Sequence, residues 1–102
     1  MKTCRIEFDF EAVAEFDSLD KGMRKRLLIQ LEKLEKNPEL GKTLGNVGGI
    51  NLTGCRSLYF DDKRMRIVYK ILEEKIVVLV LSIGKRRNEE AYKNAGKRNR
   101  KG

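Results

Sequence analysis

The chain has 102 residues, the length of a single domain, and its 23 Lys and Arg outnumber its 15 Asp and Glu to give a net charge of +8. Two Cys without any His exclude a disulfide scaffold and argue against a transition-metal site, so we expect neither a metal nor a cofactor. No apolar run reaches the roughly 18 residues of a membrane span, and we expect a soluble, cytoplasmic protein with no membrane partner.

The charge is distributed unevenly along the chain. Residues 1–51 hold nine basic and nine acidic residues, whereas residues 52–102 hold fourteen basic and six acidic residues. The whole excess therefore falls in the second half, where it predicts a surface that binds a polyanion. For the last residues, 97–102, the alternative is a basic tail that only improves solubility.

The first half of the chain predicts one strand and two helices. Residues 3–10 alternate between apolar and charged side chains, which is typical of a half-buried strand. Asp9 can cap a short helix, which Asp20 then breaks. A longer helix follows and ends at Asn37-Pro38. Its apolar stripe consists of Met23, Leu27, Leu28, Leu31 and Leu34.

The second half predicts a sheet and a final helix. Residues 39–51 are rich in Gly and lack periodicity, so we expect an irregular loop there. Three strands then follow with tight connections, which favour an antiparallel meander, over residues 52–60, 64–72 and 75–83. Asn88 can cap a short helix over 89–95, with Gly96 as its stop.

This order of elements, βααβββα, predicts an α+β fold. A helical hairpin packs on one face of a mainly antiparallel four-stranded sheet, and a short helix closes the chain. We expect one domain over residues 1–96, followed by a disordered basic tail over residues 97–102.

Basic side chains gather on one face of the predicted sheet. Alternation along 64–72 directs apolar side chains toward the helical hairpin and basic ones to the opposite, open face. The basic residues expected to converge there are Arg56, Arg64, Arg66, Lys70, Lys85, Arg86 and Arg87. Such a surface suits a phosphodiester backbone, because Arg grips phosphate oxygens in pairs and counterion release favours binding. The alternative is a solvated strand face that simply carries Lys and Arg.

Tyrosines near these cations are further candidates. Tyr92 lies on the last helix, close to Arg86, where it could stack on a base, donate a proton or simply pack as an aromatic residue. Tyr59 is a weaker candidate of the same kind. We expect Cys4 and Cys55 to be buried apolar residues rather than nucleophiles, because the chain has no His to act as their base.

Two segments resemble a known family. MRIVYKI (65–71) and EEKIVVLVLSIGKRRNEEAYKNA (73–95) are similar to the RelE branch of the RelE/ParE superfamily of bacterial toxins, and the hairpin that leads to NPELGKTLG (37–45) fits it as well. The resemblance covers residues 3–95. It implies a small α+β toxin that cuts mRNA in the ribosomal A site and is neutralised by a co-encoded antitoxin.

The resemblance also implies site residues. Arg66 and Arg86 match arginines that stabilise the phosphate under attack, and Tyr92 matches a tyrosine that orients or activates the cleavage site. Arg56 matches the first of two basic residues on the preceding strand, and the second falls on Leu58. Four other basic residues are expected to bind nucleic acid: Arg64, which could also substitute for that missing cation, Lys70, Lys85 and Arg87.

The implied reaction is metal-independent attack of the RNA 2′-hydroxyl on the adjacent phosphate. Without His, the chain offers arginines for charge stabilisation, and Tyr92 or Lys85 for proton transfer if neighbouring cations lower the pKa of either group. Two alternatives remain open. One is a ParE-like inhibitor of DNA gyrase, and the other is an inactive member of the same fold that only binds nucleic acid.

Overall fold

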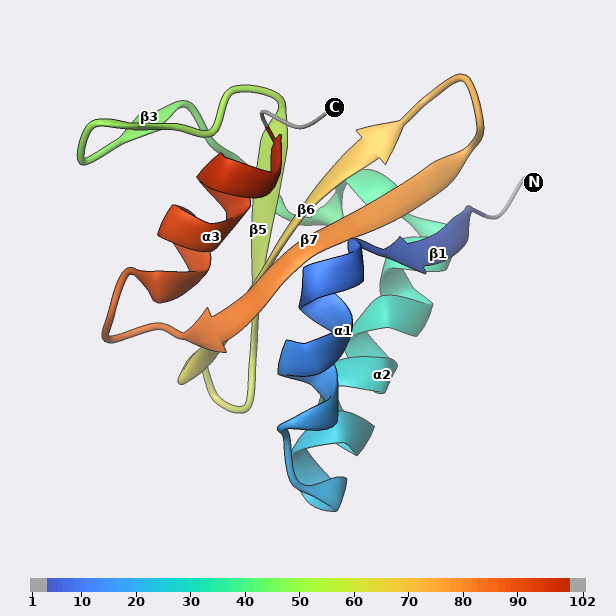
Figure 1. Cartoon of the computed structure of the whole chain (residues 1–102). Helices are drawn as coiled ribbons and strands as arrows, with labels where there is room; N and C mark the ends of the chain where they lie inside the picture. Colours follow the sequence, from blue (N-terminus) through green and yellow to red (C-terminus); the bar gives the residue numbers. More distant parts are fainter. Residues whose placement is uncertain (1–3, 100–102) are drawn as a thin grey trace.

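The computed structural model describes residues 4–99 and begins with a strand and a helical hairpin (Figure 1). Strand β1 spans Arg5–Phe8, helix α1 spans Phe10–Asp17 and helix α2 spans Lys21–Lys36. Asp9 caps α1 as predicted, because its side chain accepts a hydrogen bond of 2.9 Å from the Glu11 N–H. Asp20 does more than break α1, since it caps α2 through the Met23 N–H at 2.8 Å.

Helix α2 buries a narrower stripe than predicted. Leu27, Leu31 and Leu34 are buried, as helical spacing requires. Leu28 is 47% exposed and is therefore not part of the stripe. It lies one residue beyond Leu27, about 100° around the helix, and this rotation carries it off the buried face.

The expected loop over residues 39–51 contains short elements. A 3-10 turn, η1 (Pro38–Leu40), precedes strands β2 (Lys42–Thr43), β3 (Asn46–Val47) and β4 (Ile50–Asn51). β3 and β4 form a separate two-stranded sheet, whereas β2 joins the main sheet beside β5. Strands of two residues are too short to leave a period in the sequence, which is why they were not predicted.

The main sheet has five strands in the order β1-β7-β6-β5-β2, one more than predicted. Its central meander consists of β5 (Cys55–Phe60), β6 (Met65–Leu72) and β7 (Val77–Lys85), paired antiparallel as expected. β1 pairs in parallel with the outer side of β7. The β5–β6 turn at residues 61–63 holds three successive non-glycine residues at φ of 54°, 53° and 66°.

Helices cover both faces of the sheet (Figure 1). α1 and α2 pack on one face over a core that includes Leu27, Ile67 and Val80. Helix α3 (Glu90–Asn99) packs on the other face over a second core that includes Val68 and Leu81. The expectation of an open second sheet face is therefore wrong.

Helix α3 is longer than predicted at its C-terminal end. Gly96 is not its stop but a point of close approach, because a Cβ atom there would lie 2.6 Å from Cγ2 of Ile50. The helix continues to Asn99, so residues 97–99 of the predicted tail are helical and Arg98 is buried. The rest of that tail, residues 100–102, lies outside the described residues.

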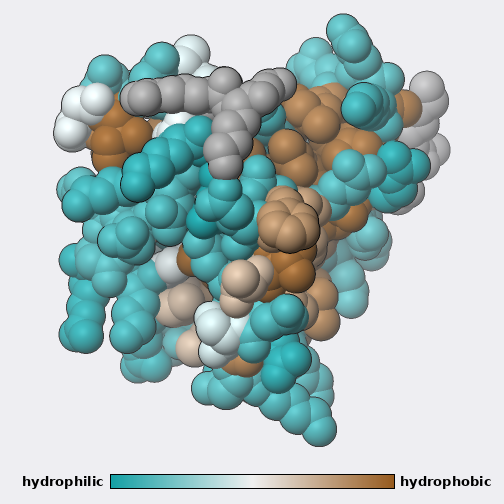
Figure 2. Space-filling view, in the orientation of Figure 1, coloured by the Kyte–Doolittle hydropathy of each residue, from teal (hydrophilic) through white to brown (hydrophobic). Residues whose placement is uncertain are grey.

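The surface in Figure 2 is mostly hydrophilic over α3, while apolar side chains gather over β1 and the neighbouring end of β7. The exposed apolar residues include Phe10, which is 90% exposed at the start of α1. Within residues 4–99, none of the helices combines the length and apolar character that crossing a bilayer requires.

Candidate active site

Arg66 lies at the centre of the candidate site. Its strand position opposite Tyr59 of β5 and Gly84 of β7 directs its side chain to the face that α3 covers. The guanidinium carbon of Arg66 lies 3.9 Å from the ring centroid of Tyr92 on α3 and 5.9 Å from that of Tyr59. The residue is only 6% exposed, so α3 and β5 hold it between two aromatic rings.

Two of the three guanidinium nitrogens of Arg66 lack a hydrogen-bond acceptor within the described part of the chain. Nη2 donates a hydrogen bond of 3.2 Å to the carbonyl oxygen of Arg86, whereas Nε and Nη1 are buried without an acceptor. Leaving a buried donor unpaired costs about 1–3 kcal/mol, and more for a charged group. A cation whose buried N–H groups lack acceptors is well suited to receive the oxygens of an anion.

Arg86 joins Arg66 at the end of β7. Its N–H donates a hydrogen bond of 2.8 Å to the Arg64 carbonyl, which extends the β6–β7 pairing by one step. Its side chain is exposed, and its guanidinium carbon lies 5.1 Å from the Tyr59 ring centroid. Tyr59 thus contacts both arginines. We call the set of Tyr59, Arg66, Arg86 and Tyr92 the arginine–tyrosine cluster.

Tyr59 belongs to this cluster more firmly than the sequence indicated. The signal that would have identified it is the register of the β5–β6 pair, in which Tyr59 stands directly opposite Arg66. The residues that β5 directs toward this face are Cys55, Ser57 and Tyr59, none of them basic. The cluster therefore combines two guanidinium groups with two phenols, and no basic residue of β5 joins them.

Arg56 lies on the opposite face of the sheet. It pairs with Tyr69, and its Nη1 donates hydrogen bonds of 3.0 Å and 2.8 Å to the carbonyl oxygens of Glu39 and Gly41. Leu58 faces the same way and packs against the helical-hairpin core. The prediction that Arg56 converges with Arg66 is wrong, because Arg56 is three residues from Tyr59 along β5, an odd number that directs the two side chains to opposite faces of the sheet.

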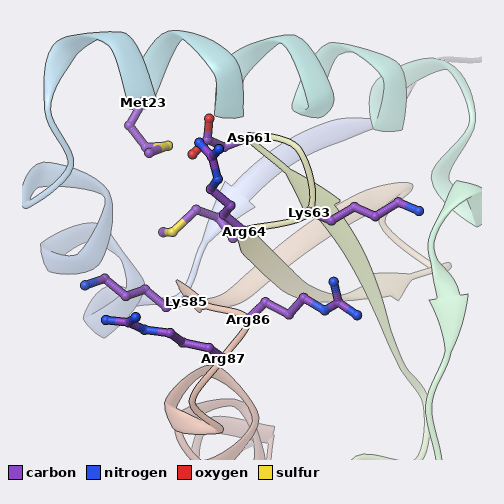
Figure 3. Close-up of a pocket in the computed structure, with 8 residues that line it drawn as sticks. Met23, Asp61, Lys63, Arg64, Lys85, Arg86 and Arg87 are labelled. Carbon is purple, nitrogen blue, oxygen red and sulfur yellow. The ribbon is translucent and has the colours of Figure 1, made fainter.

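The other predicted cations also separate. Lys70 lies at the far end of β6, where its Nζ donates a hydrogen bond of 3.0 Å to the side chain of Asn99. Arg64, Lys85 and Arg87 are exposed and line a pocket beside α2. In Figure 3, Lys85 and Arg87 point to one side of the chain and Arg86 to the other.

The two cysteines are buried and free, as predicted. Burial raises the pKa of the Cys55 thiol, and the charge of Lys70 opposes this effect only in part. The thiol form is inert, so Cys55 acts as a small apolar residue of the second core. Among residues 4–99, no group of three or more Cys, Asp or Glu side chains could hold a metal ion.

An ion-pair network that was not predicted connects α3 to α1 and β7. Arg98, 8% exposed, donates hydrogen bonds of 2.9 Å and 2.7 Å to the two carboxylate oxygens of Glu15 and one of 2.8 Å to the Leu81 carbonyl. The Glu15 carboxylate also accepts from the Ile83 N–H at 3.0 Å and from the Asn94 side chain at 3.2 Å.

The network raises the pKa of Arg98, mainly through the hydrogen bonds to Glu15, although burial acts in the opposite direction. It ties the C-terminal part of α3, the helix that carries Tyr92, to α1 and β7. The sequence held no signal for it, since the two partners are 83 residues apart.

Comparison with known proteins relates this architecture to bacterial toxins. The profile of the family described as "ParE toxin of type II toxin-antitoxin system, parDE" matches residues 6–90. The mRNA interferase toxin RelE of Escherichia coli K12 is 32% identical over 95 residues, which cover 91% of this chain and 94% of that protein.

Solved structures agree with this relationship. A mutant of the E. coli toxin RelE in its free state is 30% identical, with a TM-score of 0.75, over 96% of this chain and 98% of that one. The toxin in the E. coli RelBE toxin-antitoxin complex is 27% identical, with a TM-score of 0.67, over 80% of this chain and 95% of that one. The α+β fold expected from the resemblance is confirmed.

Proposed function

The chain belongs to the ParE toxin family of type II toxin-antitoxin systems as a RelE-like toxin, and from this membership we propose that it is a ribosome-dependent endoribonuclease that cuts mRNA. One observation carries the proposal beyond the family. Arg66 is buried against Tyr92, with Nε and Nη1 lacking acceptors in the described chain, beside the exposed cation of Arg86. This arrangement favours binding of a phosphate that gains negative charge.

The proposed reaction is attack of the RNA 2′-hydroxyl on the adjacent phosphorus. The new 2′-O–P bond forms as the 5′-O–P bond breaks, which leaves a 2′,3′-cyclic phosphate and a 5′-hydroxyl. Arg66 and Arg86 stabilise the additional charge on the phosphate oxygens. Removing one such donor typically lowers the rate by about 10²–10³-fold.

Proton transfer falls to Tyr92 in this proposal. Its ring lies against the guanidinium of Arg66, so its position is set by the same group that would hold the phosphate. Lys85, the other candidate from the sequence, points to the opposite side of the β7 end from Arg86 (Figure 3). We therefore assign orientation of the cleavage site, and the movement of its protons, to Tyr92.

The ribosome supplies what this site lacks. The chain has no His, and β5 directs no basic residue toward Arg66, so the cluster has few groups for acid-base catalysis. Correct orientation of the reacting groups can contribute ~7–11 kcal/mol. A ribosome that holds mRNA in line for attack would provide this contribution, and the reaction needs no metal ion in its chemistry.

A cognate antitoxin is the proposed protein partner. The E. coli relative has been solved in a RelBE toxin-antitoxin complex, which supports a similar assembly for this chain. The exposed apolar residues of α1 and the exposed cations after β7, Arg86 and Arg87, both offer contacts to an amphipathic or acidic partner.

The test is cleavage of mRNA on programmed ribosomes by the purified protein. The wild type should cut within the A-site codon, and Arg66→Ala should reduce the cleavage rate by at least about 10²-fold. Lys75→Ala is the matched control, because Lys75 is an exposed cation on the β6–β7 turn, and it should cut as fast as the wild type. Equal rates in all three proteins would refute the assignment.

A second candidate function is inhibition of DNA gyrase by protein binding. The absence of a basic residue on the Arg66 face of β5 and the ParE description of the family favour it. Loss of DNA supercoiling in the presence of the protein, without mRNA cleavage, would establish it in place of the ribonuclease.

A further inference from the structure

A basic pocket lies beside the arginine–tyrosine cluster at the end of β7, and Arg86 belongs to both. It has a volume of about 560 Å³ and lies between the start of α2, the β5–β6 turn and the segment that leaves β7 (Figure 3). Its lining includes Met23, Arg64, Met65, Lys85, Arg86 and Arg87. We call it the α2-side pocket.

Strand alternation explains why one short segment serves both sites. Arg66 stands opposite Gly84 and faces α3, whereas Met65 stands opposite Lys85 and faces the helical hairpin. In Figure 3, Lys85 and Arg87 accordingly point away from Arg86. The consecutive residues Lys85, Arg86 and Arg87, at and just after the end of β7, thus present cations on both sides of the chain, a few ångströms apart.

The pocket combines two kinds of surface. Met23 and Met65 supply a polarizable apolar wall, which favours contact with the face or edge of an aromatic ring. Arg64, Lys85 and Arg87 are exposed at its rim and can bind phosphate oxygens. A planar base attached to a phosphate matches this combination better than a free anion or a purely apolar ligand does.

The acidic residue of the pocket does not cancel this charge. Asp61 is largely buried, and its carboxylate lies 3.6 Å from Nε of Arg26, a cation outside the pocket lining. The positive charges of the rim therefore remain available to a phosphate.

We propose that the α2-side pocket binds an unpaired RNA nucleotide while the arginine–tyrosine cluster holds the scissile phosphate. The proposal rests on the proposed ribonuclease function and deepens it. The nucleotide is either the neighbour of the cleaved one, so that the mRNA strand crosses the end of β7, or an unpaired nucleotide of the ribosome. Both sources offer the same base and phosphate.

The first experiment tests whether the nucleotide belongs to the mRNA, and it does not require cleavage. Fluorescein-labelled 2′-O-methyl RNAs of two to six nucleotides are titrated with the intact chain, and dissociation constants are measured by fluorescence anisotropy. If the nucleotide belongs to the mRNA, lengthening the RNA enough to reach the α2-side pocket should tighten its binding to the wild type about tenfold, the factor expected from one charge-assisted contact. Lys85→Ala/Arg87→Ala should lose this gain and bind the shortest RNA as the wild type does.

The second experiment measures binding of the same proteins to ribosomes that carry a 2′-O-methyl codon in the A site. Weaker binding of the double variant here, with an unchanged length dependence on free RNA, assigns the nucleotide to the ribosome. Met23→Ala removes part of the apolar wall without a change of charge, so it should weaken binding in the same experiment as the double variant does. Lys75→Ala should bind as the wild type does in both experiments. Equal weakening at all RNA lengths, or no weakening in either experiment, would overturn the proposal. Failure of the wild type to cut mRNA would instead refute the ribonuclease function.

Discussion

Replacing Arg98 by Ala should lower the free energy of unfolding more than replacing an exposed charged residue does. Arg98 is 8% exposed, and its guanidinium donates to both carboxylate oxygens of Glu15 and to the Leu81 carbonyl. Asp9 and Glu11 also lie within 3.9 Å and 3.6 Å of its Nε. The substitution leaves several carboxylates close together without their shared cation.

The magnitude follows from what remains around Glu15. Removing one partner of a buried ion pair typically costs about 3–5 kcal/mol. The Ile83 N–H and the Asn94 side chain still donate to the carboxylate, and its side chain is 22% exposed, so solvent compensates part of the loss. We therefore expect the lower end of the range, about 3 kcal/mol, which corresponds to a fall in Tm of roughly 12 °C or more for a domain of this size.

The assay is urea denaturation followed by circular dichroism, with Arg5→Ala as the matched control. Arg5 and Glu7 also form an Arg–Glu pair, at 3.0 Å, but their side chains are 71% and 45% exposed. An exposed pair contributes only about 0.2–1 kcal/mol. If Arg98→Ala and Arg5→Ala lower the free energy of unfolding by the same amount, the buried network does not hold α3 in place.

Three other substitutions test the packing and the site. Gly96→Ala should lower stability by about 1–3 kcal/mol despite the better helix propensity of Ala, because its Cβ meets Cγ2 of Ile50 at 2.6 Å; thermal denaturation measures this. Tyr69→Phe should cost about 1–3 kcal/mol in urea denaturation, since its hydroxyl donates to Pro38 and accepts from Gly41. Tyr59→Ala should slow mRNA cleavage about 3–30-fold, the range of a lost cation–π contact, whereas Tyr59→Phe should cut at the wild-type rate.

The Tyr69 variant also has a pH signature. Burial raises the pKa of Tyr69 above 10.0 despite the hydrogen bond from Gly41, so the folded protein keeps this proton to higher pH than the unfolded chain does. The corresponding stability is present below pH 10 and is lost as the pH rises through the folded-state pKa. Tyr69→Phe should lack this decline, and a decline of the same size in both proteins would contradict the assignment.

The sequence predicted the elements whose patterns are local. Alternation along residues 64–72 correctly separated Met65 and Ile67 from Arg66, because one face of β6 must bury against the hairpin. The resemblance placed Arg66, Arg86 and Tyr92 together, and the structure brings all three into one cluster.

Features that depend on long-range pairing were not predictable in the same way. The position of Arg56 relative to Arg66 depends on the register of β5 against β6. The three left-handed residues of the intervening turn help to set this register. Likewise, the sequence alone assigns Arg98 to a basic tail, because its partner Glu15 is known only from the structure. The cover over the second sheet face had two local signs. Residues 76–83 are apolar on both faces of their strand, which predicts at least partial cover on both sides. Ala91, Ala95 and Gly96 form a small-residue stripe that fits a helix packed closely on a sheet.

The central claim is that Arg66 and Arg86 make this toxin an mRNA endonuclease. The most direct measurement is induction of the chain in a bacterial host, with growth followed and mRNA 5′ ends mapped, for the wild type and for Arg66→Ala/Arg86→Ala. The wild type should arrest growth and produce new ends within translated codons, while the folded double variant should do neither. New ends at the same codons in the double variant, or arrest by the wild type without new ends, would contradict the account.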